Sequence, residues 1–397
     1  MLALRACSFH TPTDSYNNPM LDPVRQEVIA LARTVVVKVG TNVLTRADGA
    51  LEPSRVQALA DQLQRLRAGG RKVALVSSGA IGAGMGRLGL AKRPTDLRQL
   101  QACAAVGQTF LMRAYEDCLA RHGVPTAQVL LTAGDFDNRA RYLNARNTIV
   151  TLFEWGCLPI INENDTVSVA EIRFGDNDQL AALVTNLLQA PLLILLSVVE
   201  GLFTADPRTD PNAELVRTVP HIDAEVLDRA GASRSALGSG GMRSKLRAAR
   251  LATAAGESVI MAGGERPDVL DAIFRAEPVG TLFLPHNTTM PAWKRWLGYA
   301  ARPRGRFLVD AGARQVVQAQ GRSLLAIGAV QGVGTFGKGD VVALCDAGGV
   351  EFARGLTNYS SVAAERLKGL RSEQIRDAVG DVPYEEVVHR DNLVVVA

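Results

Sequence analysis

The chain is poor in paired cysteines, catalytic histidine patterns and long apolar runs, and each shortage excludes a class of protein. Its five cysteines are widely spaced and form no CxxC pair, which argues against a disulfide scaffold or a structural zinc site and favours a reducing, cytoplasmic setting. No apolar run approaches the roughly 18 residues of a membrane-spanning helix, so we expect no membrane partner. The five histidines fall outside every motif described below, and neither a Ser-His-Asp nor an HExxH arrangement occurs.

The bulk composition is typical of a globular protein with more than one domain. Of the 397 residues, 47% are hydrophobic and 21% are charged, and the formal net charge is +4. This length predicts two or three domains with an ample core. So small a net charge does not indicate a nucleic-acid or membrane-surface partner.

Short apolar runs alternate with helical patterns through most of the chain. Five runs are rich in Val, Ile and Leu and end in small or polar residues, namely 34–40, 72–79, 158–165, 192–197 and 258–264. Helical periodicity occurs between them, over 54–68, 96–122 and 242–256. The alternation predicts an α/β domain with a mostly parallel sheet. Ligands of such sheets bind beyond the carboxyl ends of the strands, where the small and polar residues of this chain gather.

Two lysines lie close to glycines in a way that suits an anion. Lys38 interrupts the apolar run 34–40, and a lysine there is costly unless its ammonium group reaches water or an anion. Lys245 belongs to LGSGGMRSKL, residues 237–246, which precedes a helical pattern. This segment is not a Walker A loop, because that motif places Gly, Lys and Ser or Thr in direct succession. A snorkelling lysine and a flexible glycine-rich loop are the alternatives.

A further glycine-rich segment, SSGAIGAG at residues 77–84, follows a predicted strand. It offers serine hydroxyls and free backbone N–H groups at the start of a helix, which together form a general anion site. A tight strand-to-helix turn would use the same residues.

Two polar clusters lie next to the predicted strands and helices. INENDTV, residues 161–167, contains Asn162 and Asp165, a set that suits the ammonium and carboxylate groups of an amino acid, or else a solvated loop. In GDNDQLAALV, residues 175–184, Asp176, Asn177 and Asp178 directly precede an apolar helical pattern. A helix cap needs one such residue, and three consecutive polar groups exceed that need.

This set of residues favours phosphoryl transfer. That reaction depends on positioning and on charge neutralisation, which two lysines, several aspartates and glycine-rich loops can supply. A carboxylate acceptor is already ionised at pH 7, so the reaction would need no histidine base.

The sequence changes character near residue 300. PAWKRWLGYAARPRGR, residues 291–306, is basic and aromatic, contains proline, and is interpreted as a linker. Short strand-like runs separated by turns follow, which predict a small all-β domain over 304–397. This part contains eleven Lys or Arg and eleven Asp or Glu. Because binding to a phosphate backbone depends on basic residues, RNA is not a favoured partner.

Six strings together resemble the glutamate 5-kinase family of the amino acid kinase superfamily: VVVKVGTNVLT, VSSGAIGAGMGRLG, LLTAGDFDNRARYLNARNT, PIINENDTVSVAEIRFGDNDQLAALV, GLFTADPR and GSGGMRSKLRAA. The tail, with GKGD, ARGLTNYSS and VVHRDNL, resembles a PUA domain. The resemblance implies a three-layer α/β sandwich with a mostly parallel central sheet. It also implies an N-terminal extension over 1–33, a catalytic domain over 34–296, a linker over 297–303 and a PUA-like domain over 304–397.

The same resemblance implies phosphorylation of the L-glutamate γ-carboxylate by ATP, the first step of proline synthesis. Lys38 and Lys245 would neutralise the transferring group, and Asp178 would orient both lysines. The glutamate-binding residues would be Ser78, Asn162, Asp165 and Asn177. The nucleotide would contact Lys38, Ser197, Val198, Ser239, Gly240, Gly241, Met242, Arg243, Ser244 and Lys245.

The resemblance further implies that Mg²⁺ arrives with ATP, that proline inhibits by feedback, and that the chain forms a homodimer or homotetramer. One position departs from the family pattern, because Ser197-Val198 stands where Ser/Thr-Asp is usual. Two alternatives stay open: an RNA-binding regulator on a retired kinase fold, and an amino acid kinase that acts on another carboxylate or on a carbamate.

Overall fold

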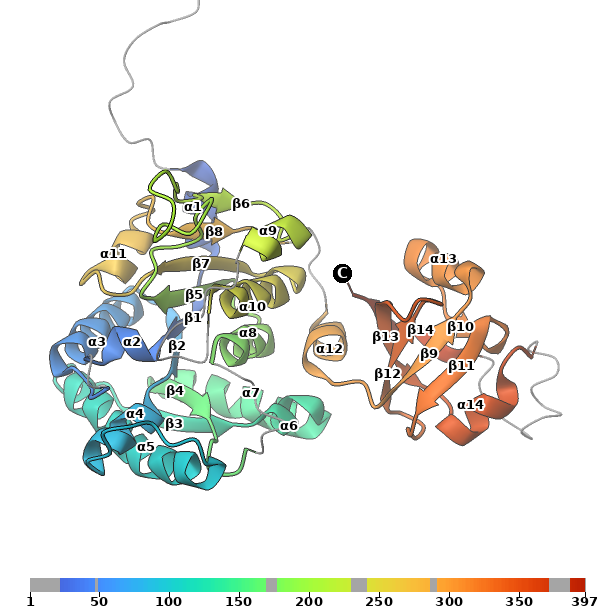
Figure 1. Cartoon of the computed structure of the whole chain (residues 1–397), viewed down its shortest axis with the longest axis horizontal. Coiled ribbons are helices and arrows are strands. Elements are labelled where there is room, and N and C mark those ends of the chain that lie inside the picture. The colour runs from blue at the N-terminus through green and yellow to red at the C-terminus, as the bar shows by residue number, and fades with distance from the viewer. Residues whose placement is uncertain are drawn as a thin grey trace, which may run out of the picture.

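A computed structural model describes residues 22–46, 49–168, 177–229, 241–285, 291–370 and 386–396, and two sheets organise them (Figure 1). The larger sheet and its helices form one body, drawn from blue to yellow, and the smaller sheet forms a second, drawn in orange and red. No helix within the described ranges has the length and apolar character needed to cross a bilayer.

The larger sheet has eight strands in the order β3-β4-β2-β1-β5-β7-β8-β6, and every pairing is parallel except that of β7 with β8. Five strands match the predicted apolar runs and confirm the mostly parallel sheet: β1 (Thr34–Val39), β2 (Lys72–Ser77), β4 (Leu158–Glu163), β5 (Leu192–Ser197) and β7 (Ser258–Gly263). Three strands that the sequence did not reveal lie toward the sheet edges: β3 (Thr126–Leu131), β6 (Thr218–Val219) and β8 (Thr281–Phe283). They are partly polar or very short, so they lack the apolar signal of a buried strand.

Helices cover both faces of this sheet, and each face has its own apolar core. Successive residues of a strand contribute alternately to the two cores. On β1, Val35 and Val37 face a core shared with α3, α5 and α11, whereas Val36 faces one shared with α7, α8 and α10. The covering helices are α1 (Pro23–Leu31), α2 (Thr41–Leu44), α3 (Pro53–Ala68), α4 (Ala80–Arg87), α5 (Leu97–Ala120), α6 (Ala133–Asp137), α7 (Arg139–Glu154), α8 (Asn177–Leu188), α9 (Ala224–Arg229), α10 (Met242–Ala254) and α11 (Val269–Phe274).

The three helices expected from periodicity are α3, α5 and α10, and local signals explain their ends. Pro53 occupies the first turn of α3, and the chain leaves the helix through Gly70 with a φ of +84°. The Asp96 side chain accepts the backbone N–H of Gln99 and caps the start of α5.

The smaller sheet has the strand order β10-β14-β13-β12-β9-β11 and a separate apolar core. Its elements are β9 (Gly305–Val309), α13 (Ala311–Gln320), β10 (Leu324–Leu325), a 3-10 turn (Ala326–Gly328), β11 (Ala329–Gly334), β12 (Val341–Cys345), β13 (Glu351–Thr357), α14 (Ser361–Leu367) and β14 (Glu386–Val395).

Residues 292–300 connect the two bodies as a packed helical segment, α12 (Ala292–Arg295) followed by a π-helical turn, η2 (Trp296–Ala300). Trp296 is buried, and its indole N–H donates to the carbonyl of Phe136 at 2.9 Å. Leu297 lies in the same apolar cluster as Val394 of the smaller sheet. This segment therefore packs against both bodies.

Candidate active site

The carboxyl ends of the central strands and the first turns of α8 and α10 meet at one place. Lys38 is the fifth residue of β1, and its backbone pairs with Val76 of β2 and Leu195 of β5. Lys38 lies two residues after Val36, so its side chain points to the face of the sheet that α8 and α10 cover. Strand alternation thus directs this lysine toward the helices that carry Asp178 and Lys245.

Asp178 joins the two lysines. Its carboxylate is fully buried in the first turn of α8 and forms an ion pair with Lys38 through Oδ1. Lys245, in the first turn of α10, donates from Nζ to Asp178 Oδ2 at 3.0 Å. The two lysines are only 5% and 6% exposed, respectively. The residues expected to form the charged centre are therefore in contact.

The charges of this centre do not cancel. Burial disfavours the ionised carboxylate of Asp178, but the Lys38 and Lys245 ammonium groups outweigh it and lower the pKa of that carboxyl. Within this set of three residues, two ammonium groups share one carboxylate, so the formal charges of the three sum to +1 in a largely desolvated place. An anion brought to this point would complete the charge balance.

The residue before Asp178 organises a polar cluster on the neighbouring strands. Asn177 Nδ2 lies 3.0 Å from the Ser77 carbonyl oxygen, 3.0 Å from Ser78 Oγ and 2.8 Å from Asn162 Oδ1. An amide nitrogen has only two hydrogens, so three acceptors compete for them. The Ser78 hydroxyl can instead donate to a ligand while the other two acceptors keep Asn177 in place.

Asp165 lies in the turn that follows β4, three residues beyond Asn162, and is partly exposed. Asp176, which adjoins Asn177 in the sequence, lies outside the described residues. The structure thus assembles Ser78, Asn162 and Asn177 by direct contacts and places Asp165 on the adjoining turn.

The glycine-rich segment is described only from Gly241 onward, and Ser239 and Gly240 lie outside the described ranges. Gly241 is the N-cap of α10, and its carbonyl accepts the backbone N–H groups of Ser244 and Lys245. Met242 and Arg243 form the first turn of that helix. The first N–H groups of a helix favour an anion in front of them.

The end of β5 presents an apolar surface. Ser197 is buried, and its carbonyl accepts Gly264 N–H at 2.7 Å. Val198 is 47% exposed and Val199 is 36% exposed directly beyond it. The resemblance described above implies an aspartate at residue 198, and the exposed valine offers an apolar surface there instead.

Tyr115, near this site, escaped the sequence analysis as a site residue, whereas Ser77 was considered as part of the segment 77–84. The hydroxyl oxygens of Tyr115 and Ser77 lie 2.9 Å apart, and both side chains are fully buried. Tyr115 belongs to the apolar stripe of α5, where only the need of a buried phenol for a hydrogen-bond partner could have singled it out.

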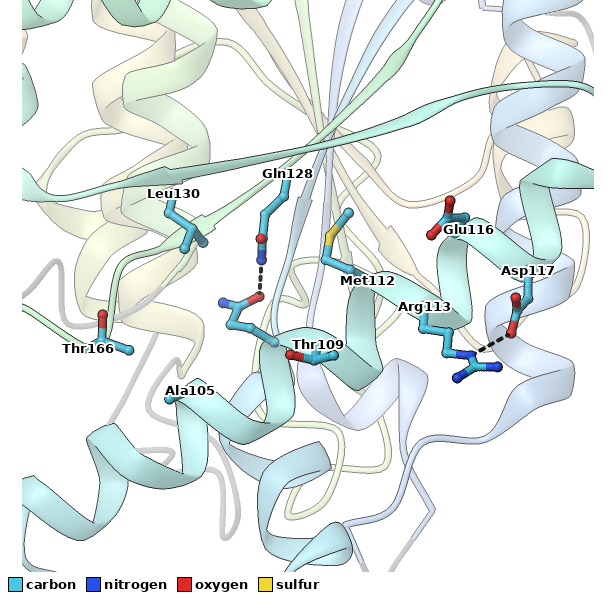
Figure 2. A pocket seen from close by; sticks show the side chains of 10 residues that line it. Ala105, Thr109, Met112, Arg113, Glu116, Asp117, Gln128, Leu130 and Thr166 are labelled. Atoms are coloured by element: carbon cyan, nitrogen blue, oxygen red, sulfur yellow. Dashed lines mark hydrogen bonds and ion pairs between the residues drawn. The ribbon is translucent and has the colours of Figure 1, made fainter.

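A separate hollow of about 670 Å³ lies between α5 and the edge strand β3 (Figure 2). Gln128 points from β3 toward α5 and donates to Gln108 Oε1 at 3.1 Å. Thr166, from the turn that carries Asp165, also lines this hollow. Its lining contains none of the residues of the charged centre.

Comparison with known proteins places the two bodies in known families. The amino acid kinase family matches residues 33–262, and the PUA domain matches residues 305–379. Glutamate 5-kinase of Citrifermentans bemidjiense is 45% identical over 94% of this chain and 100% of its own length. Glutamate 5-kinase of Ralstonia pickettii is 47% identical over 93% of this chain and 99% of its own length. Among solved structures, carbamate kinase from Giardia lamblia bound to AMP-PNP aligns with a TM-score of 0.47 at 19% identity, covering 64% of this chain and 99% of that chain.

Proposed function

The chain belongs to the glutamate 5-kinases of the amino acid kinase family, and on that premise we propose that Lys38, Asp178 and Lys245 form its phosphoryl-transfer centre. The reaction is ATP-dependent phosphorylation of the L-glutamate γ-carboxylate to L-glutamyl 5-phosphate, the first step of proline biosynthesis. The observation that carries the assignment of the centre is the pair of buried ammonium groups that share one carboxylate.

The charge balance of this centre suits the reaction. The glutamate carboxylate is ionised at neutral pH and can attack the γ-phosphorus of ATP without a base. Negative charge on the transferring group is then stabilised by Lys38 and Lys245, which are held in place before the reaction begins. Asp178 positions both ammonium groups, and its lowered pKa keeps it ionised.

We assign glutamate to the polar cluster beside the centre. Asp165 would pair with the substrate ammonium group. The Ser78 hydroxyl would donate to its oxygens. Asn177 would lie beside the same oxygens, with its amide nitrogen held by the Ser77 carbonyl and by Asn162 through the 2.8 Å contact.

We assign ATP to the segment from Ser239 to Lys245 and to the end of β5. The first turn of α10 would face the phosphates. Ser197 and Val198 would lie near the base or sugar. The phosphates would also contact backbone N–H groups or side chains of the other residues of this loop, namely Ser239, Gly240, Gly241, Met242, Arg243 and Ser244.

We propose that Mg²⁺ enters with ATP and is held mainly by its phosphates. The described residues contain no group of three or more His, Cys, Asp or Glu side chains that could hold a metal ion. Both oxygens of Asp178 face lysine ammonium groups. No step above depends on Mg²⁺.

Further properties complete the proposal. Proline, which resembles glutamate and is the end product of the pathway, would inhibit by feedback. The enzyme would act in the cytoplasm as a homodimer or homotetramer. The domain limits would be 34–296 for catalysis and 304–397 for the PUA domain, whose balanced charge argues against RNA.

An assay of ADP release over a panel of carboxylates tests the activity. We expect release with L-glutamate and Mg²⁺-ATP, and hydroxylamine should trap the product as the γ-hydroxamate. Preferred turnover of aspartate, N-acetylglutamate or carbamate would contradict the proposal.

A further inference from the structure

Helix α5 contributes a hydroxyl group to the site that the roles above do not use. Tyr115 is fully buried on α5, and its phenol oxygen lies 2.9 Å from Ser77 Oγ. Ser77 is the last residue of β2 and directly precedes Ser78. We propose that Tyr115 is a positioning residue for glutamate, which acts by fixing the backbone that presents Ser78 and Asn177. This inference rests on the glutamate kinase function proposed above.

A chain of hydrogen bonds connects the phenol with the substrate side. Ser77 Oγ donates to the Ser78 carbonyl oxygen at 3.2 Å, so its own oxygen is left to accept the Tyr115 hydroxyl. The Ser77 carbonyl oxygen accepts Asn177 Nδ2 at 3.0 Å. Residues 77 and 78 are thus held by α5 on one side and by α8 on the other.

The phenol is suited to act as a fixed donor. It lies in an apolar cluster with Leu111 and Leu119, its neighbours on the same helix. Burial raises the pKa of Tyr115, although the Ser77 hydrogen bond opposes the rise. The hydroxyl therefore keeps its proton at every pH at which a kinase works. Without Ser77, the buried Tyr115 hydroxyl would lose this hydrogen bond, which costs free energy in an apolar environment.

Two glycines allow α5 to approach the loop so closely. A Cβ atom at Gly107 would lie 1.7 Å from the Ala80 carbonyl oxygen, and one at Gly84 would lie 1.8 Å from the Cys103 carbonyl oxygen. Helices α4 and α5 therefore cross backbone against backbone. Because α4 begins at Ala80, directly after the Ser77–Gly79 segment, this crossing also sets the separation between Tyr115 and Ser77.

The test uses the full chain and three variants, Tyr115→Phe, Ser77→Ala and the double variant. Tyr142→Phe is the matched control, because it also removes a buried phenol hydroxyl, on α7, whose pKa burial raises to about 12. The unchanged chain is assayed first, so failure of the proposed function is seen before any variant is compared. The measurements are kcat, the KM values for glutamate and for ATP, and the thermal unfolding midpoint.

We expect Tyr115→Phe to raise the glutamate KM about threefold to tenfold, as loss of one neutral hydrogen bond would do. The ATP KM and kcat should stay within about twofold, since Phe keeps the ring in place. The double variant should be no worse than the more affected single variant, because both lose the same interaction. Tyr142→Phe should leave the glutamate KM unchanged.

If the Tyr115 hydroxyl contributed only to the stability of the fold, the result would be different. An unchanged glutamate KM in Tyr115→Phe would overturn the proposal, whether or not the unfolding midpoint falls. Equal increases in both KM values, or fully additive effects of the two substitutions, would also overturn it.

Discussion

Lys245 Nζ lies 3.0 Å from Asp178 Oδ2, and this pair joins the first turns of α10 and α8. The other oxygen of the same carboxylate faces Lys38 on β1. One buried aspartate therefore orients two ammonium groups from separate elements. Removal of Asp178 would take the shared carboxylate away from both buried ammonium groups, which is costly in a low-dielectric site.

The first prediction concerns this centre. Lys38→Ala, Lys245→Ala and Asp178→Ala should each lower kcat by at least about 10²-fold, the scale of losing one preorganised electrostatic group. Initial rates at saturating substrates measure the effect. Lys72→Ala is the control, because Lys72 is exposed at the opposite end of the neighbouring strand β2 and should keep normal kcat. Near-normal kcat in Lys245→Ala would show that Lys245 and its glycine-rich segment do not take part in phosphoryl transfer.

A second prediction follows from the lowered pKa of Asp178, where the two lysines outweigh burial. A group with a depressed folded-state pKa adds stability above its unfolded pKa, near 3.9, and loses it as the pH falls through the folded value. The unfolding free energies of the unchanged chain and of Asp178→Asn should differ by a constant amount from pH 8 to about 5. This difference should shrink below about pH 4. Urea unfolding at several pH values measures it, and a difference that grows on acidification would contradict the assignment.

A third prediction concerns Val198 at the end of β5, which is 47% exposed. An aspartate there could accept hydrogen bonds from the base or sugar, and valine cannot. A hydrogen bond to a charged group is worth roughly 1.5–3 kcal/mol, so Val198→Asp should lower the ATP KM or change the preference among ATP, GTP and CTP. The glutamate KM should stay the same. Rates with each nucleotide at saturating glutamate decide the question, with the equally apolar Val198→Ile as control. A change confined to glutamate would show that Val198 does not face the nucleotide.

The last prediction concerns the smaller sheet. Every residue with a proposed role precedes residue 246, so a chain ended after Arg302 should still phosphorylate glutamate. Trp296 and Leu297 share one apolar cluster with Val341 and Val394, and truncation would expose this surface. We therefore expect a lower thermal unfolding midpoint and reduced solubility. A truncated chain that folds, as judged by circular dichroism, but has no activity would show that the smaller sheet builds the site.

Much of the catalytic body could be predicted from local sequence. Apolar runs such as 192–197 form strands because consecutive side chains of a buried strand all meet apolar surroundings. Strand β3 has a partly exposed pattern at the sheet edge, so its sequence gives no comparable signal. The two-residue strand β6 is too short for any periodicity to be detected.

The sequence by itself predicted the five central strands, the helices α3, α5 and α10 and the candidate site residues, because near neighbours set backbone preferences and motifs keep their spacing. Only the tertiary structure decided that Lys38 faces α8 and α10, that Asp178 lies between two lysines, and that Asn177 contacts both Ser78 and Asn162. The bond from Tyr115 to Ser77 also depends on how closely α4 and α5 cross. Such contacts join residues far apart in the chain, and the packing of whole elements fixes them.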